Sequence, residues 1–107
     1  MTNYPGIVED EGRAALLAEV LKGVAHPVRL RIVAALCERS HNVGELARKL
    51  GVRQSLVSQH LSLLRLHGLV APKKNGTSIT YSLGERRLRD LVRCLAGCGG
   101  NDNRGER

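Results

Sequence analysis

The sequence of 107 residues predicts a mainly α-helical domain with one small β-hairpin. Two helical patterns meet at a tight turn, and two short strand patterns then flank Asn75 and Gly76, a dipeptide suited to a type I′ hairpin turn. With two further helices before this unit and one after it, the order is α-α-α-α-β-β-α, the plan of a winged helix-turn-helix. We expect a flexible segment at residues 1–11, the folded domain at 12–98 and a disordered tail at 99–107.

The first two helices are predicted from apolar residues at helical spacing. Residues 12–24 place leucines and valines on one face, which is typical of an amphipathic helix. The next helix begins at Pro27, because proline suits the first turn of a helix. Its apolar run reaches Cys37 and contains no polar residue after Arg31. A helix that is apolar on most sides is buried, so we expect this one to be central to the core.

The third helix begins at Asn42, whose side chain can accept a hydrogen bond from a free backbone amide while Glu45 completes a capping box. It ends at Gly51, since a residue without a Cβ atom readily adopts the left-handed conformation that turns the chain. A fourth helix follows, and its periodic apolar residues are expected to be buried: Leu56, Val57, Leu61, Leu64 and Leu66.

The opposite side of the fourth helix carries short polar side chains in its first turns. Such groups hydrogen-bond base edges when the front of a recognition helix enters the major groove of DNA. The strands expected at residues 69–71 and 78–82 form the wing, whose loop carries two lysines. The predicted DNA-contacting residues are Arg53, Gln54, Ser55, Ser58, Gln59, His60, Lys73, Lys74, Asn75 and Thr77. For His60 the alternatives are packing and a phosphate contact; for the whole pattern, the alternative is a helical hairpin with a solvated basic loop.

Positive charge is concentrated in the same stretch. Residues 39–77 hold seven basic side chains and one acidic side chain, which is +6 of the net +7 of the chain. Phosphate contacts supply most non-specific affinity for DNA, so charge placed here favours a nucleic-acid partner. RNA is a less favoured partner because the chain has no Phe or Trp to stack on bases. A membrane surface is also less favoured, because the chain lacks a basic amphipathic helix with aromatic anchors.

The sequence also limits the class of protein. No apolar run approaches the length of a membrane span, and residues 1–10 lack the pattern of a signal peptide, so we expect a cytoplasmic protein with reduced cysteines. An enzyme is not expected, because the chain has no Gly-rich phosphate loop, nucleophile elbow, Cys-x-x-Cys pair or evident carboxylate pair. An architectural protein that binds DNA without sequence preference is the remaining alternative to a sequence-specific regulator.

The last helix, expected at residues 85–97, carries an apolar stripe made by Leu88, Leu91, Val92 and Leu95. Two amphipathic helices at the ends of a small chain compete for one core, so we expect the first and last helices to form a homodimer interface. A two-fold symmetric protein suits the palindromic operators that helix-turn-helix proteins read in double-stranded DNA. The alternative is a monomer in which both helices pack on its own core.

The chain resembles the ArsR/SmtB family of repressors over about residues 12–98. The motifs that carry the resemblance are AHPVRLRI at 25–32, VGELA at 43–47, SLVSQHL at 55–61, Leu64, HGLV at 67–70 and ITYSL at 79–83. The resemblance implies a homodimer, paired through its first and last helices, that occupies its own operator and leaves it when an inducer is bound. Arg53 departs from the family pattern, since many relatives have a small capping residue there, and we expect it to contact phosphate instead.

The inducer depends on the cysteines. The family's arsenic-type site places Cys-x-Cys at the start of the first DNA-reading helix, where this chain has no cysteine. Its zinc-type site needs a histidine on the last helix, which here offers only Asp90. In relatives that sense reactive sulfur, a cysteine on the second helix pairs with one at the end of the last helix. Cys37, Cys94 and Cys98 are similarly placed, with Cys37 about one turn later than usual.

Three interpretations of these cysteines stay open. In the first, Cys37 forms a disulfide or polysulfide bridge with Cys94 or Cys98, favoured by the charge of Arg39 or Arg93, and no cofactor is required. In the second, the three thiolates bind a soft metal or metalloid such as arsenite, cadmium or zinc, since cysteines four residues apart face one side of a helix. In the third, Cys37 is a core residue and the other two fill the dimer stripe.

Overall fold

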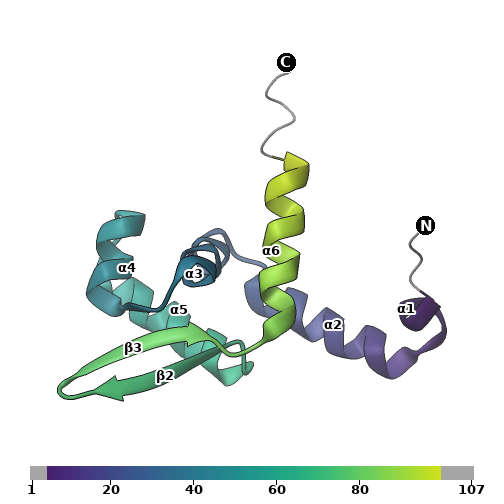
Figure 1. The fold of residues 1–107 in the computed structure, drawn as a ribbon, viewed down its shortest axis with the longest axis horizontal. Coiled ribbons are helices and arrows are strands. Elements are labelled where there is room, and N and C mark those ends of the chain that lie inside the picture. Colours follow the sequence, from purple (N-terminus) through teal and green to yellow (C-terminus); the bar gives the residue numbers. More distant parts are fainter. Residues whose placement is uncertain (1–4, 100–107) are drawn as a thin grey trace.

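The computed structural model describes residues 5–99, with side chains for residues 6–96. Its elements are α1 (Pro5–Glu9), α2 (Glu11–Val24), α3 (Pro27–Glu38), β1 (His41–Asn42), α4 (Val43–Leu50), α5 (Gln54–Leu66), β2 (Val70–Asn75), β3 (Ser78–Leu83) and α6 (Arg86–Gly99). This order confirms the predicted winged helix-turn-helix and adds two short elements, α1 and β1 (Figure 1). Within the described residues, no helix combines the length and the apolar character needed to cross a membrane.

The central helix of the core is α3, as its apolar sequence predicts. Ile32 and Val33 are fully buried. Buried side chains from the surrounding elements pack in the same cluster: Val24, Leu46, Leu61, Leu64, Leu69, Val70 and Leu88. The prediction that Leu66 is buried is wrong, because its side chain is 81% exposed. Leu66 lies two residues after the buried Leu64, which places it about 200° around α5 and away from the core.

The helix-turn-helix is formed by α4 and α5. The predicted capping box is confirmed: Asn42 Oδ1 accepts a hydrogen bond from the Glu45 amide (2.8 Å), and Glu45 Oε1 accepts one from the Asn42 amide (2.9 Å). Gly51 ends α4 in the left-handed region, with φ = 73°. The Arg31 guanidinium of α3 donates to the Leu50 carbonyl oxygen (3.1 Å). Both ends of α4 are therefore fixed by specific polar contacts.

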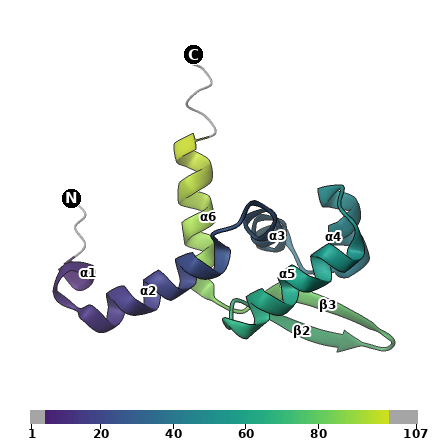
Figure 2. The same ribbon diagram turned by 180° about the vertical axis from the view of Figure 1, so that it is seen from behind.

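The wing is an antiparallel hairpin of β2 and β3, in which Asn75 pairs with Ser78, so the turn residues are Gly76 and Thr77. The predicted type I′ turn at Asn75-Gly76 is wrong, because that turn needs positive φ at both residues and only Gly76 has it (φ = 64°). β2 continues four residues past its predicted end, because the hairpin extends beyond the core into residues without an apolar pattern, whereas β3 is longer than predicted only by Leu83, which packs against the core. β1 adds a third strand, giving the order β1-β3-β2. A strand of two residues has no readable alternation, so the sequence pattern does not predict it. Figures 1 and 2 show the hairpin projecting beside α5, on the side away from α2.

The two terminal helices extend from the core in different directions (Figures 1 and 2). α6 packs against α3 and β3, and its Leu88 is fully buried, whereas Leu95 near its end is 48% exposed. α1 lies within the N-terminal segment for which the sequence predicts no helix. α6 continues two residues beyond its predicted end, and the predicted tail lies outside the described residues except for Gly99, which closes this helix.

Candidate DNA-binding surface and thiol site

The polar side of α5 faces solvent. Gln54, Ser55, Ser58 and Gln59 are all exposed, while Val57, on the opposite side of the same turns, is fully buried. The helical period thus separates the candidate base-contacting residues from the core. The structure brings these four predicted residues together on one surface, where Gln and Ser side chains have the donors and acceptors that base edges require.

The start of α5 is open to an anion. Arg53 is the N-cap residue, it is exposed, and its side chain makes no capping hydrogen bond to the first turn. The free amides of this turn and the positive end of the helix dipole therefore lie beside a guanidinium. This arrangement offers the chemistry of a phosphate contact, and the predicted role of Arg53 stays a prediction.

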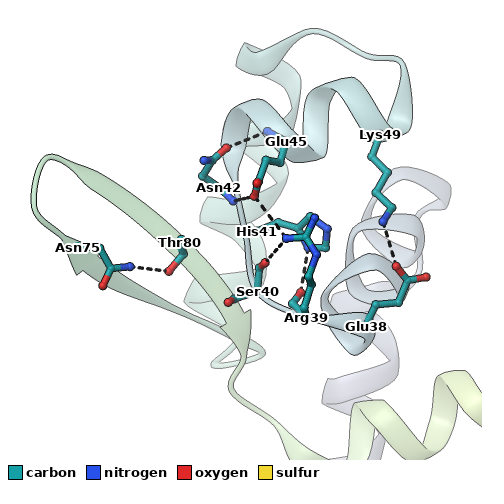
Figure 3. Close-up of polar contacts among 9 residues, drawn as sticks. All are labelled: Glu38, Arg39, Ser40, His41, Asn42, Glu45, Lys49, Asn75 and Thr80. Atoms are coloured by element: carbon teal, nitrogen blue, oxygen red, sulfur yellow. Dashed lines mark hydrogen bonds and ion pairs between the residues drawn. The ribbon is translucent and has the colours of Figure 1, made fainter.

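Lys73, Lys74 and Thr77 are exposed on the wing, and neither lysine forms an ion pair with any described residue. Asn75 is also exposed, and its Nδ2 donates to Thr80 Oγ1 (3.2 Å), which links the two strands at the tip (Figure 3). The lysines can therefore turn toward a phosphate, whereas Asn75 already has a partner within the hairpin.

Arg48 is a further basic residue near the site, and its position is not evident from the sequence pattern. It is exposed in the last turn of α4. A Cβ atom placed on Gly44 would lie 3.7 Å from Arg48 Nη1 and 3.6 Å from Gln54 Nε2, so both side chains flank the same point. Its neighbour Lys49 is instead paired with Glu38 (2.9 Å; Figure 3). The only sequence signal for Arg48 is the net charge of the segment, which does not say which cation is free.

His60 does not belong to the exposed surface. Its side chain is 8% exposed and its ring centroid lies 4.4 Å from that of His26. Burial lowers the pKa of His60, and the charges of His26 and Arg29 lower it further. His26 Nδ1 accepts a hydrogen bond from the Val28 amide (3.1 Å), so this histidine caps α3. Of the two roles considered for His60, the structure supports packing, because the ring lies on the inner side of α5.

Cys37 lies in the last turn of α3, partly buried against the core, next to two arginines of α6. The Arg89 guanidinium donates to the Cys37 carbonyl oxygen. Burial raises the pKa of the Cys37 thiol, while the positive charges of Arg89 and Arg93 oppose the rise. Arg39, the other cation expected near this thiol, instead contacts Glu45 (3.8 Å) and the Ser40 carbonyl oxygen (3.1 Å; Figure 3).

The second cysteine, Cys94, is exposed on α6, and neither Cys37 nor Cys94 is in a disulfide. Successive residues of a helix are about 100° apart, so Cys94 points away from the side on which Arg89 and Arg93 face α3. Cys98 lies in the last turn of α6, and its side chain is outside the described residues. Among the described side chains, no three metal-binding groups come together, and the predicted three-cysteine site is therefore untested.

An apolar pocket of about 330 Å³ lies between α1, α2 and α6. It is lined by Ile7, Ala14, Leu17, Ala18, Val20, Leu21, Arg87 and Leu91. Around it, Leu16 and Leu21 of α2 and Leu95 of α6 are about half exposed. The two helices expected to form a dimer interface thus leave three leucines about half exposed beside an apolar pocket in the single chain.

Comparison with known proteins links this geometry to a family. Residues 26–71 match the family described as bacterial regulatory protein, arsR family. A biofilm growth-associated repressor from Xylella fastidiosa is 41% identical over 85 residues, covering 79% of this chain and 75% of the relative. Transcriptional activator HlyU from Vibrio cholerae is 34% identical over 87 residues, covering 81% of each chain.

Solved structures share the fold. Reduced HlyU from V. cholerae has a TM-score of 0.78 and 33% identity, covering 85% of this chain and 96% of that one. The homodimeric winged helix-turn-helix DNA-binding domain of Mb0332 from Mycobacterium bovis has a TM-score of 0.71 and 25% identity, covering 88% and 90%.

Proposed function

Because the chain belongs to the ArsR family of bacterial regulatory proteins, we propose that it is a sequence-specific DNA-binding repressor. It acts as a cytoplasmic homodimer and leaves its operator when its cysteines react with an oxidant or a reactive sulfur species. The observation that carries the DNA-binding part is the exposed polar face of α5 beside a basic wing. Members of this family are DNA-binding regulators, and we propose no catalytic activity for this protein.

The proposed complex places α5 in the major groove. Gln54 and Gln59 then meet base edges, where a glutamine side chain can make two hydrogen bonds to adenine. Arg53 and Lys73, from the start of α5 and from the wing, lie where phosphates flank the groove, and Arg48 extends this basic rim. This division assigns sequence preference to the helix and salt-dependent affinity to the rim.

The proposed dimer pairs α2 and α6 with the same helices of a second copy. Half-exposed leucines and an apolar pocket on these helices support this arrangement, because a single chain leaves that surface in water. The similar Mb0332 domain is described as homodimeric. A two-fold axis would place two α5 helices one DNA turn apart, so the operator should be palindromic.

Repression is the proposed direction of regulation. The X. fastidiosa relative is named a repressor, whereas the less similar HlyU is named an activator. A protein that covers promoter DNA and then leaves it on induction needs no contact with the transcription machinery. In transcription from its own promoter with purified components, the reduced protein should lower transcript yield, and an increase would contradict repression.

The proposed inducer reacts chemically with the cysteine thiols and is not a metal ion that they bind. Two arginines adjoin Cys37, and their charge disfavours a divalent cation at this sulfur. One solved structure of the similar V. cholerae protein is that of reduced HlyU, and this supports a redox-sensitive mechanism as the proposal. Binding of arsenite, cadmium or zinc to Cys37, Cys94 and Cys98 is the competing mechanism.

The test is fluorescence anisotropy of the reduced, metal-free protein on labelled DNA from upstream of its own gene. A persulfide donor added in the presence of a chelator should release the DNA, and dithiothreitol should restore binding. Continued binding with the donor, followed by release with arsenite, cadmium or zinc, would replace thiol chemistry with metal sensing.

Single cysteine variants identify the reacting groups. Cys37→Ser should abolish release by the donor while leaving operator affinity intact, because the thiol lies away from the exposed side of α5. Cys94→Ser and Cys98→Ser show which cysteine of α6 takes part. Full induction in Cys37→Ser would contradict the proposed role of this residue.

A further inference from the structure

The contact between α3 and α6 places positive charge at the most protected thiol of the described chain. Arg89, on the first half of α6, donates to the carbonyl oxygen of Cys37 itself. Arg93 follows one helical turn later, on the same side of α6, and both side chains are exposed. The Arg89 guanidinium therefore lies at the backbone of Cys37, and Arg93 extends the positive charge along the same side of α6.

The charges around this thiol do not cancel. The groups that act on Cys37 are Arg89 and Arg93 from α6 and Glu38 from its own helix. Glu38 is occupied: its Oε1 accepts a hydrogen bond from Lys49 of α4 (2.9 Å). Glu38 therefore has Lys49 as its ion-pair partner, whereas no described carboxylate pairs with Arg89 or Arg93.

We propose that Arg89 and Arg93 make Cys37 selective for negatively charged thiol-reactive molecules, such as disulfides or polysulfides that carry carboxylate or sulfide charge. Both arginines are positioning residues, because they act on the approach of the reactant and not on the sulfur bond. Neutral oxidants, such as hydrogen peroxide, gain nothing from this charge. The inference rests on the proposed thiol-sensing function and specifies which reactants it admits.

The reaction that this charge assists is thiol–disulfide exchange. The Cys37 thiol first loses its proton to water or buffer, and the thiolate then attacks one sulfur of the reactant. A bond forms between Cys37 Sγ and that sulfur, the sulfur–sulfur bond of the reactant breaks, and its electron pair leaves with the second sulfur as a thiolate. The reactant is the oxidant, so no further electron acceptor is needed.

The test compares two alkylating reagents that differ in charge and little else. Iodoacetate is an anion and iodoacetamide is neutral, and both react with the same thiolate. A change in the pKa of Cys37 therefore cancels in the ratio of their rates. Rates are measured on the full-length reduced protein by mass spectrometry of the peptide that contains Cys37, so the other cysteines do not interfere.

In the wild type, the iodoacetate to iodoacetamide ratio at Cys37 should exceed the ratio for free cysteine by about threefold. Salt at about 0.5 M should remove most of this excess, since screening acts on charge and not on packing. Arg89→Gln and Arg93→Gln should each lower the ratio, and Arg89→Lys should retain it. Arg65→Gln, which removes an exposed cation on α5, is the matched control and should leave the ratio unchanged.

A wild-type ratio equal to that of free cysteine would overturn the proposal, as would equal losses in Arg89→Gln and Arg65→Gln. Because Arg93 makes no described hydrogen bond to α3, Arg93→Gln keeps the test valid if Arg89→Gln fails to fold. Failure of the proposed function is seen separately. In that case the persulfide donor leaves the DNA bound while the alkylation ratio still shows charge selection.

Discussion

At the scale of single residues, the position around a helix decides the role of each side chain of α5. Gln59 and His60 are neighbours in the sequence, yet Gln59 is exposed and His60 is buried beside His26. The 100° step of the helix turns one toward solvent and the other toward the core. Polar character alone therefore does not identify a DNA-contacting residue.

The division between base and phosphate contacts gives a prediction for two exposed residues. Gln59→Ala should weaken operator binding by about 1–3 kcal/mol with little effect on random DNA, if glutamine makes a bidentate base contact. Lys73→Ala should weaken both DNAs alike and reduce the salt dependence of binding. Anisotropy titrations on operator and random duplexes at several salt concentrations measure both effects. Equal losses on the two DNAs for Gln59→Ala would show that it contacts the backbone.

The buried histidine predicts how stability depends on pH. Burial lowers the pKa of His60 below its ordinary value of 6.5, so the folded protein binds fewer protons there than the unfolded chain does. The contribution of neutral His60 to the free energy of unfolding is fully present above pH 6.5, and it decreases as the pH falls below this value. The free energy of unfolding in urea should be lower at about pH 5.5 than at about pH 7.5. His60→Gln should reduce the difference, and an unchanged difference would contradict this origin.

At the scale of elements, the short segment between α3 and α4 joins the thiol site to the DNA-reading unit. Cys37 is held by Arg89 of α6, and the next residue, Glu38, is bound by Lys49 of α4. Arg39 then contacts Glu45 in the first turn of α4 (Figure 3). In the proposed mechanism, a change of bonding at Cys37 would reach α4 through these adjacent residues, without a long path across the core.

The capping box at the end of this segment should stabilise the fold measurably. Asn42→Ala removes the hydrogen bond to the Glu45 amide, so the free energy of unfolding should fall by about 1 kcal/mol. Urea denaturation followed by circular dichroism measures this loss. Ser62→Ala, an exposed change in the middle of α5, is the control and should stay within about 0.5 kcal/mol of the wild type. Equal stabilities of the two variants would mean that the cap is frayed in solution.

At the scale of the whole molecule, one chain leaves two amphipathic helices without a complete partner. α2 and α6 meet around an apolar pocket, and leucines of both helices are half exposed. Burial of about 40 Å² of apolar surface is worth about 1 kcal/mol, so such a surface favours association over exposure to water. A second copy is the partner proposed here, because a two-fold symmetric protein matches a palindromic operator.

The dimer can be tested with two exposed leucines. Leu21→Glu places a charge at the edge of the pocket, so it should yield monomers by light scattering and weaken operator binding more than tenfold, because one subunit then binds one half-site. Leu66→Glu introduces the same charge at an 81% exposed leucine outside α2 and α6, and it should remain dimeric. A dimeric Leu21→Glu protein would place the interface elsewhere.

Much of the fold is predictable because its signals are local. The capping box at Asn42 and the glycine that ends α4 each depend on a few adjacent residues, and both are confirmed. The wing hairpin is also confirmed, although its turn lies at Gly76 and Thr77 and not at the predicted Asn75-Gly76. The strand β1 is not predictable in this way, because it exists only through its pairing with β3. The candidate site divides similarly: its exposed polar residues follow from periodicity, whereas the burial of His60 depends on His26, which is 34 residues away.

The sequence by itself determined the winged helix-turn-helix, the family and the location of positive charge, since these depend on spacing and composition. Only the tertiary structure decided which cations lie beside Cys37 and which are already paired. Arg89 is 52 residues from Cys37 in the chain and touches it because α6 folds back onto α3, whereas Arg39, two residues away, turns toward Glu45. Electrostatic neighbours are set by distance in space, and the packing of helices fixes that distance.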